Sequence, residues 1–149
     1  MQSFRVIKPT AALVPYVRHY WVLSDDALAP VSERTLPVGC VQMVFHRGRQ
    51  LFSLTEGRLQ PSSFISGQAF GYSDVESTGM LEMIVVVFQP FAAKAFLHMP
   101  VSEFRGMNVN TEETGDPLLV DLGRRIADMP DRVACIRLIE EFLLSRLYA

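Results

Sequence analysis

Cysteine is scarce in this sequence: Cys40 and Cys135 are too few for a disulfide framework in a chain of 149 residues. Both lie among apolar neighbours, which is typical of reduced thiols in a core. Long hydrophobic runs are missing as well. The longest, residues 83–88, is far too short to cross a bilayer, and residues 1–15 lack the apolar stretch of a secretory signal. We therefore expect a cytoplasmic protein with no membrane partner.

A surplus of basic residues is also missing. The 14 Lys and Arg residues are outnumbered by 16 Asp and Glu, which gives a formal net charge of −2. Nucleic-acid binding draws much of its affinity from neutralised phosphates, so this chain is not expected to hold DNA by itself. The hydrophobic fraction of 49% and the charged fraction of 20% are those of a folded globular domain with a sizeable core.

Metal-binding and catalytic motifs are absent from the sequence. The three histidines, His19, His46 and His98, stand singly, with no HxH, HExxH or CxxC pattern to supply clustered ligands. No GxSxG elbow, P-loop or dinucleotide-binding glycine fingerprint occurs either. We therefore predict that the chain is not an enzyme and that it binds neither a metal ion nor a cofactor.

Short stretches rich in β-branched and aromatic residues fill the chain up to about residue 90. Turn-forming residues separate them, including the stretch at residues 71–74. Closely spaced short strands of this kind favour a barrel or a sandwich. Strands are predicted at residues 4–7, 16–23, 40–46, 50–54, 63–66 and 81–88.

Helical spacing takes over after residue 90, beginning with a short helix predicted at residues 91–98. Asp116 before Pro117 predicts an N-cap and a helix from there to about residue 128. Pro130 and Asp131 open a second helix with a wide apolar face that runs to the end of the chain. We expect one α+β unit, with a β domain at residues 1–90 and a helical segment at residues 91–149 packed on it.

Five motifs follow one another along the chain: VPYVRHYW at 14–21, RTLPVGCVQMVFHRG at 34–48, FISGQ at 64–68, VVVFQPFAAKAFLHMPVSEF at 85–104 and EEFLLSRL at 140–147. In this order they resemble the N-terminal domain of a subgroup of AraC-type transcription regulators, over essentially the whole chain. Two positions depart from the subgroup. Val38 stands where an acidic residue is common, and Phe91 where a small residue is commoner.

The resemblance implies a cupin-like antiparallel β-barrel or sandwich that senses a small-molecule effector, followed by helices that form a homodimer. It also implies that DNA is contacted only through helix-turn-helix motifs of a C-terminal domain, which this chain does not contain. The expected function is therefore that of the ligand-sensing and dimerisation domain of a bacterial transcription regulator.

The effector is expected inside the barrel or at its mouth, between aromatic walls and two polar anchors. The expected walls are Trp21, Phe45, Phe52 and Tyr72, and the anchors are Arg34 and Gln68. The wide apolar face of the last helix is expected to form the dimer interface, because a C2 pair of helices would cover it. Its residues are Ile136, Ile139, Leu143 and Leu147.

Two alternatives stay open. The first is a metal-free cupin-like enzyme such as an isomerase or epimerase, which requires a carboxylate or histidine pair converging in the pocket. The second is a stand-alone dimeric module that binds a small molecule without a downstream DNA-binding domain.

Overall fold

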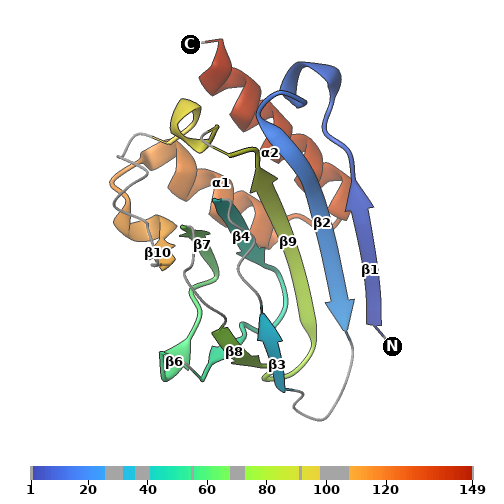
Figure 1. Cartoon of the computed structure of the whole chain (residues 1–149), viewed down its shortest axis with the longest axis vertical. Coiled ribbons are helices and arrows are strands. Elements are labelled where there is room, and N and C mark those ends of the chain that lie inside the picture. The colour runs from blue at the N-terminus through green and yellow to red at the C-terminus, as the bar shows by residue number, and fades with distance from the viewer. Residues whose placement is uncertain are drawn as a thin grey trace.

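Two antiparallel sheets and two C-terminal helices make up the part of the chain that the computed structural model describes (Figure 1). That part comprises residues 2–25, 32–35, 41–54, 56–67, 73–90, 92–97 and 108–148. The larger sheet has the strand order β1-β2-β9-β4-β7-β10. Its strands are β1 (Gln2–Ile7), β2 (Val17–Asp25), β9 (Leu81–Phe88), β4 (Gln42–His46), β7 (Ser63–Ser66) and β10 (Asn108–Asn110).

The smaller sheet lies at the end of the larger sheet where β9 begins (Figure 1). Its order is β3-β8-β5-β6, with β3 (Ser32–Thr35), β8 (Ser73–Glu76), β5 (Phe52–Ser53) and β6 (Arg58–Leu59). Val75 of β8 and the neighbouring Leu51 join one apolar cluster with residues of β4, β7 and β9. The smaller sheet therefore packs on one face of the larger sheet, which we call the inner face.

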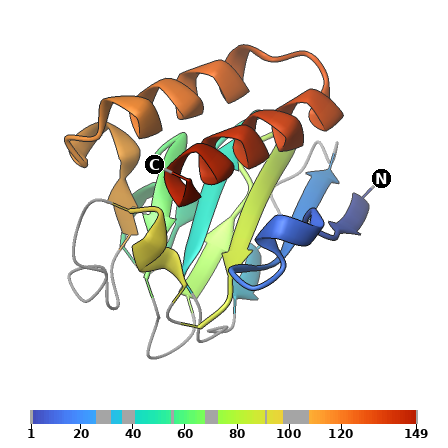
Figure 2. The ribbon, with the colours of Figure 1, turned by 90° about the horizontal axis from the view of Figure 1, so that it is seen from above.

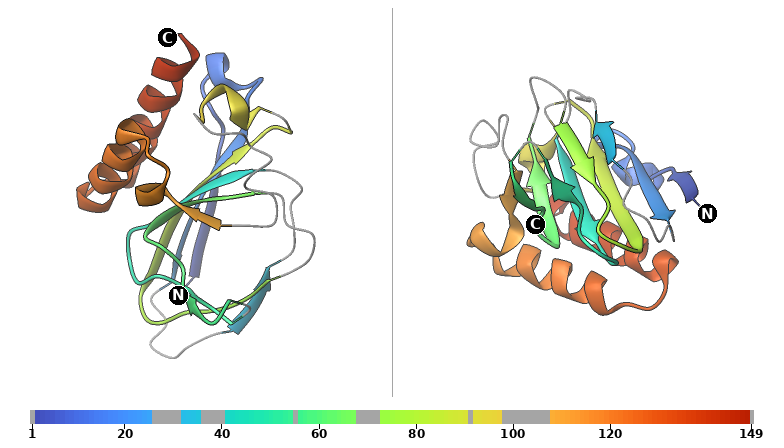
Figure 3. Two further views of the ribbon diagram at one scale, coloured as in Figure 1. Left: turned by 90° about the vertical axis from the view of Figure 1, so that its left-hand side faces the viewer. Right: turned by 90° about the horizontal axis from the view of Figure 1, so that it is seen from below.

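The helices α1 (Pro117–Asp128) and α2 (Arg132–Leu147) cover the opposite, outer face of the larger sheet (Figures 2 and 3). Each helix begins at an aspartate whose side chain accepts a hydrogen bond from a backbone N–H of the first turn. Asp116 accepts from Leu119 N, and Asp131 accepts from Val133 N. Pro117 occupies the first turn of α1, where its missing N–H would have no partner in any case.

The main core lies between the outer face and the two helices. Its buried side chains interlock from both layers, and this packing holds α2 against the centre of the sheet. They include Tyr20, Phe45 and Ile84 from the strands and Leu122, Ile126, Ile139 and Leu143 from the helices. Gly123 lets α1 approach the sheet closely, because a Cβ at this position would lie 2.6 Å from Ser63 Oγ.

Two buried arginines fasten the helices at their ends. Arg146 in the last turn of α2 pairs with Asp116, at 2.6 and 2.8 Å from its two carboxylate oxygens, and both side chains are 5% exposed. Arg47, directly after β4, donates to the carbonyl oxygens of Ile126 and Met129 at the end of α1.

Arg47 also pairs with a carboxylate of the sheet. Glu82 of β9 accepts hydrogen bonds from both Arg47 and Arg132, the first residue of α2. The bend between the helices is thus tied to the ends of β4 and β9.

Several predicted elements are confirmed. β7 and β9 have their expected bounds, α1 and α2 begin and end within a residue or two of expectation, and the architecture is α+β with mostly antiparallel sheets. Among the described strands the two sheets are open. Within the described residues, no helix is long and apolar enough to span a membrane.

Other predictions were incomplete or wrong. The sequence did not predict β3, β6, β8 or β10, and Ser73 and Asp74 belong to β8 instead of a turn. In place of a helix over 91–98, the described residues there form a 3-10 turn, Ala93–Ala95. The segment 91–149 also contributes β10 to the larger sheet, so it is not purely helical.

Candidate ligand site on the inner face of the larger sheet

Strand alternation separates the two faces of the larger sheet residue by residue. In β4, Met43 and Phe45 belong to the core beneath the helices, whereas Val44 belongs to the apolar cluster of the inner face. His46 shares the inner face with Val44, and its ring lies 6.1 Å from that of Phe64, another member of the inner cluster. Each strand therefore serves the core with one set of residues and the inner face with the other.

An apolar row crosses the inner face from β2 to β7. The strand register places Trp21 opposite Val85, Val85 opposite Val44, and Val44 opposite Phe64. The last three are buried, whereas Trp21 is half-buried and contacts the ring of Phe4 on β1 at a centroid distance of 5.7 Å. Trp21 is the only tryptophan of the chain, so its fluorescence reports on this surface alone.

A row of polar side chains runs parallel to the apolar row, two residues further from the smaller sheet, a spacing of about 7 Å. The strand register places each residue of this row directly opposite the next one on the adjacent strand. The residue that β9 contributes to the row, Val87, is apolar. We call its half-buried side chains the polar row: His19 (β2), Gln42 (β4), Ser66 (β7) and Asn108 (β10).

The polar row makes few hydrogen bonds with the described residues. Ser66 Oγ donates a long bond of 3.5 Å to Gly67 O, but the described residues offer no hydrogen-bond partner to the side chains of His19, Gln42 or Asn108. Burial and the neighbouring Arg18 lower the pKa of His19, so its imidazole is neutral at pH 7. The row therefore presents neutral donors and acceptors beside an apolar surface.

A buried histidine, His46, lies on the other side of the apolar row from the polar row, next to the smaller sheet. His46 is 4% exposed, and its Nε2 lies 2.9 Å from Gln60 Oε1. Because the amide oxygen can only accept, Nε2 carries the proton and Nδ1 has a free lone pair. Nδ1 is buried without a hydrogen-bond partner among the described residues. Burial lowers the pKa of His46, which keeps the ring neutral.

Trp21 is the predicted ligand-binding residue that the structure places at this site. The expectation for Phe45 was wrong, because this side chain is 1% exposed in the core beneath the helices. Phe52 was also misplaced. It pairs with Glu76, whereas the buried face of the smaller sheet carries the adjacent pair of Ser53 and Val75.

For the remaining predicted ligand-binding residues, Arg34, Gln68 and Tyr72, the structure describes no side-chain contacts. Arg34 lies on β3 opposite Asp74, which fixes only its position along the strand. Gln68 and Tyr72 lie outside the described residues, as does Cys40. Cys135 is a fully buried free thiol, and burial raises its pKa, in agreement with the expectation of an inert core cysteine.

The predicted dimer-interface residues form part of the core of this chain. Ile139 and Leu143 have no exposed surface, and Ile136 is 8% exposed. Leu147 is partly buried against the same cluster. These side chains face the sheet because α2 needs its broad apolar face to pack there, so the structure contradicts their role as a free interface.

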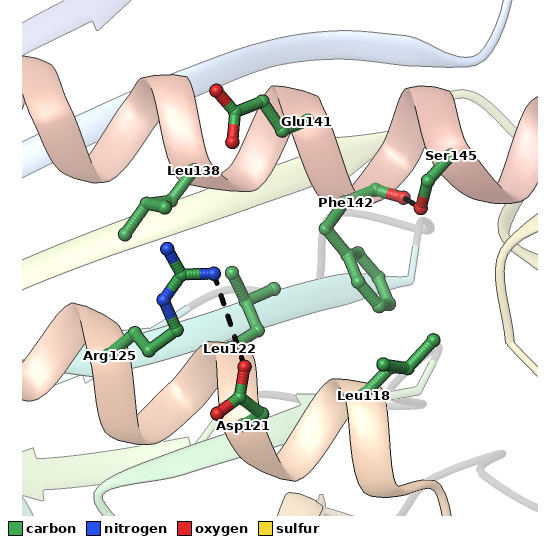
Figure 4. Close-up of a pocket in the computed structure, with 8 residues that line it drawn as sticks. All are labelled: Leu118, Asp121, Leu122, Arg125, Leu138, Glu141, Phe142 and Ser145. Atoms are coloured by element: carbon green, nitrogen blue, oxygen red, sulfur yellow. Dashed lines mark hydrogen bonds and ion pairs between the residues drawn. The ribbon is translucent and has the colours of Figure 1, made fainter.

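A groove of about 200 Å³ lies instead on the outer side of the helices, between α1 and α2 (Figure 4). Leu118, Leu122, Leu138 and Phe142 line its apolar part. Asp121, Arg125 and Glu141 stand at its rim, where Arg125 Nη1 lies 4.0 Å from Asp121 Oδ2. Leu118 is 60% exposed, so its side chain is accessible at this groove.

Sequence reasoning missed most of the polar groups of the inner face. Gln42 and His46 were hidden in an apolar run, although the alternation of Gln42, Val44 and His46 with Val41, Met43 and Phe45 is visible in the sequence. Asn108 had no such signal, because its three-residue strand exists only through pairing with β7.

Comparisons with known proteins give a family but no activity. No curated protein matches the chain. Among solved structures, a crystal structure of CoII HppE in complex with Tris buffer is similar, with a TM-score of 0.43 and 10% sequence identity over 58% of this chain. The chain spans about half of that protein, namely 53%. A family model matches residues 5–110, which include the described strands of both sheets except the first three residues of β1. The chain therefore belongs to the family described as "Domain of unknown function (DUF6597)".

Proposed function

We propose that this chain is a small-molecule-binding domain whose ligand lies on the inner face of the larger sheet, against Trp21 and the polar row. The observation that carries the proposal is the juxtaposition of a half-buried aromatic surface with four neutral polar side chains, three of which have no hydrogen-bond partner among the described residues. Pockets for small molecules combine these features: apolar walls supply affinity and a few polar groups fix orientation.

The resemblance to AraC-type regulators extends this proposal. In it, the two sheets form a cupin-like sensor, the helices mediate homodimerisation, and a C-terminal helix-turn-helix domain contacts DNA. The formal net charge of −2 supports the assignment of DNA contact to another domain. The ligand would shift the arrangement of domains or subunits only by its differential affinity for the two states, typically about 1–3 kcal/mol.

The positions of two histidines favour binding over the enzyme alternative. His19 and His46 both lie on the inner face, but their partners on β9, Val87 and Met83, are four residues apart. This separation is about 13 Å along a strand, too far for both imidazoles to act on one reacting atom.

Screening a metabolite library tests the binding proposal directly. Ligands should raise the melting temperature of the protein and change the emission of Trp21, because binding to the folded state adds to its stability. The matched variant Trp21→Phe should lose the optical signal while the thermal shift largely remains. A uniformly flat response of the wild type in both measurements would contradict the proposal.

The groove between α1 and α2 is our candidate for the dimerisation surface. Leu118→Glu would place a charge on its apolar part, whereas Val133→Glu changes a valine that is 62% exposed and does not line the groove. Sedimentation should show a dimer for the wild type and for Val133→Glu, and a folded monomer for Leu118→Glu. A monomeric wild type at micromolar concentration would contradict this part of the proposal.

A further inference from the structure

The chemistry of the polar row restricts the kind of ligand that the inner face accepts. Its four polar side chains are an imidazole, two amides and a hydroxyl, and no described member of the row is a lysine, arginine or carboxylate. Gln42 stands directly opposite Ser66, and Ser66 directly opposite Asn108, so their side chains are spaced by about 5 Å across adjacent strands.

The apolar row lies parallel to this polar row, on the side nearer the smaller sheet. A ligand body placed against Trp21 can reach the polar row with its other end, because strands β2, β9, β4 and β7 keep one register across both rows. An elongated molecule with one apolar end and one polar end matches this arrangement.

We propose that the inner face recognises a small amphiphilic molecule with an uncharged, hydrogen-bonding head group, such as a hydroxyl or a carboxamide. Its head lies at Gln42, Ser66 and Asn108, and its apolar body lies against Trp21. The inference rests on the proposed function and adds the ligand class to it.

Charge explains the preference for a neutral head. An amide or hydroxyl exchanges its bonds with water for bonds to Gln42 and Asn108, which both donate and accept. A carboxylate or phosphate would lose part of its hydration without a cationic partner in the row, and burying an unpaired charge is far more costly than burying a satisfied neutral group. His19 does not supply that cation, because its lowered pKa keeps it neutral at pH 7.

A set of probes with one tail and four heads tests the inference. The probes are 1-octanol, octanamide, octanoate and octyl phosphate, titrated into the full chain at pH 7 while the emission of Trp21 is recorded. The two neutral probes should bind with Kd values at least about tenfold lower than those of the two anions. Equal or tighter binding of either anion overturns the inference, and so does a complete lack of response.

A matched pair of variants locates the head group. Gln42→Leu should weaken octanamide binding about tenfold, a typical effect of losing one or two hydrogen bonds. Gln50→Leu makes the same change outside the polar row, where Gln50 donates to Ser62 Oγ, and should leave the Kd unchanged. An unchanged Kd in Gln42→Leu overturns the head-group assignment.

These outcomes separate the inference from the function on which it rests. Similar binding of all four probes, with a response at Trp21, overturns the head-group preference and leaves a small-molecule-binding domain. The metabolite screen judges the proposed function by itself, since it does not depend on any of these probes.

Discussion

The two faces of the larger sheet are built from the same strands, yet they differ in how completely they are closed. On the outer face, α1 and α2 bury the strand residues that point towards them near the centre of the sheet, such as Tyr20 on β2 and Phe45 on β4. On the inner face, the cluster around Val85 is buried, but Trp21 and the polar row beside it remain half-exposed. Complete burial is therefore concentrated on the outer face, and polar side chains that can still accept a ligand's hydrogen bonds are concentrated on the inner face.

The largest effect should come from a charge placed in the outer core. Leu143→Glu places a carboxylate at a position with no exposed surface, at a cost of about 5 kcal/mol, comparable to the whole stability of many domains. Circular dichroism should show an unfolded protein. Val133→Glu on the same helix is the control, because the exposed valine should change the free energy of unfolding by no more than about 0.5 kcal/mol. A folded Leu143→Glu variant would contradict the assignment of Leu143 to a tightly packed core.

Truncating one aromatic side chain on each face sharpens the contrast. Phe45→Ala leaves a cavity in the outer core and should lower the free energy of unfolding by about 4 kcal/mol. Trp21→Ala removes a half-exposed side chain and should cost only about 1–2 kcal/mol, although the tryptophan is larger. Urea denaturation measures both values. A greater loss from Trp21→Ala would show that the inner face carries as much of the stability as the outer.

The buried ion pair that joins the two helices should have a somewhat smaller effect. Asp116→Ala removes the N-cap of α1 and leaves the Arg146 guanidinium buried without this carboxylate, so we expect a loss of about 3 kcal/mol. Asp121→Ala is the exposed control: its contact with Arg125 spans 4.0 Å and should contribute less than about 0.5 kcal/mol. Equal urea midpoints for the two variants would contradict the role given to the buried pair.

The smallest predicted effect is a pH dependence on the inner face. Burial lowers the pKa of His46 below its ordinary value of 6.5, so below that pH the unfolded chain binds more protons than the folded one. Stability should therefore fall as the pH drops from 6.5 towards the folded pKa, with a slope of at most about 1.4 kcal/mol per pH unit.

Two variants test whether His46 causes this dependence of stability on pH. His46→Gln should remove it from a series of urea melts, whereas His19→Gln should remove only a small part, because His19 is half-exposed. An unchanged slope in His46→Gln would show that other groups control the acid sensitivity.

Local signals in the sequence were sufficient for the helices and the most apolar strands. Asp116 and Asp131 mark helix starts through capping chemistry that acts within a few residues. The apolar run from Leu81 to Phe88 is rich in β-branched residues, which is typical of a strand buried on both faces. These elements are defined by their own residues, so a single sequence predicts them.

The missed strands are defined by their partners instead. Residues 32–35, 73–76 and 108–110 are mostly polar, and they become strands only because β3 pairs with β8 and β10 pairs with β7 across the chain. The same reason hid the polar row, since His19, Gln42, Ser66 and Asn108 come together only through the register of five strands. The prediction that Phe45 contacts the ligand failed for a related reason. A phenylalanine suits the core and the inner face equally well, and only the alternation of side chains along β4 determines which face it occupies.

The interleaving in β4 has a consequence for how this protein can change over time. Gln42, Val44 and His46 serve the inner face, while Met43 and Phe45 serve the core under the helices. Inserting or deleting one residue in this strand would exchange the two sets, placing an imidazole in the hydrophobic centre and a phenyl ring on the inner face. New ligand preferences can therefore arise here by replacing side chains at alternate positions, but a change in the length of the strand would cost the fold itself.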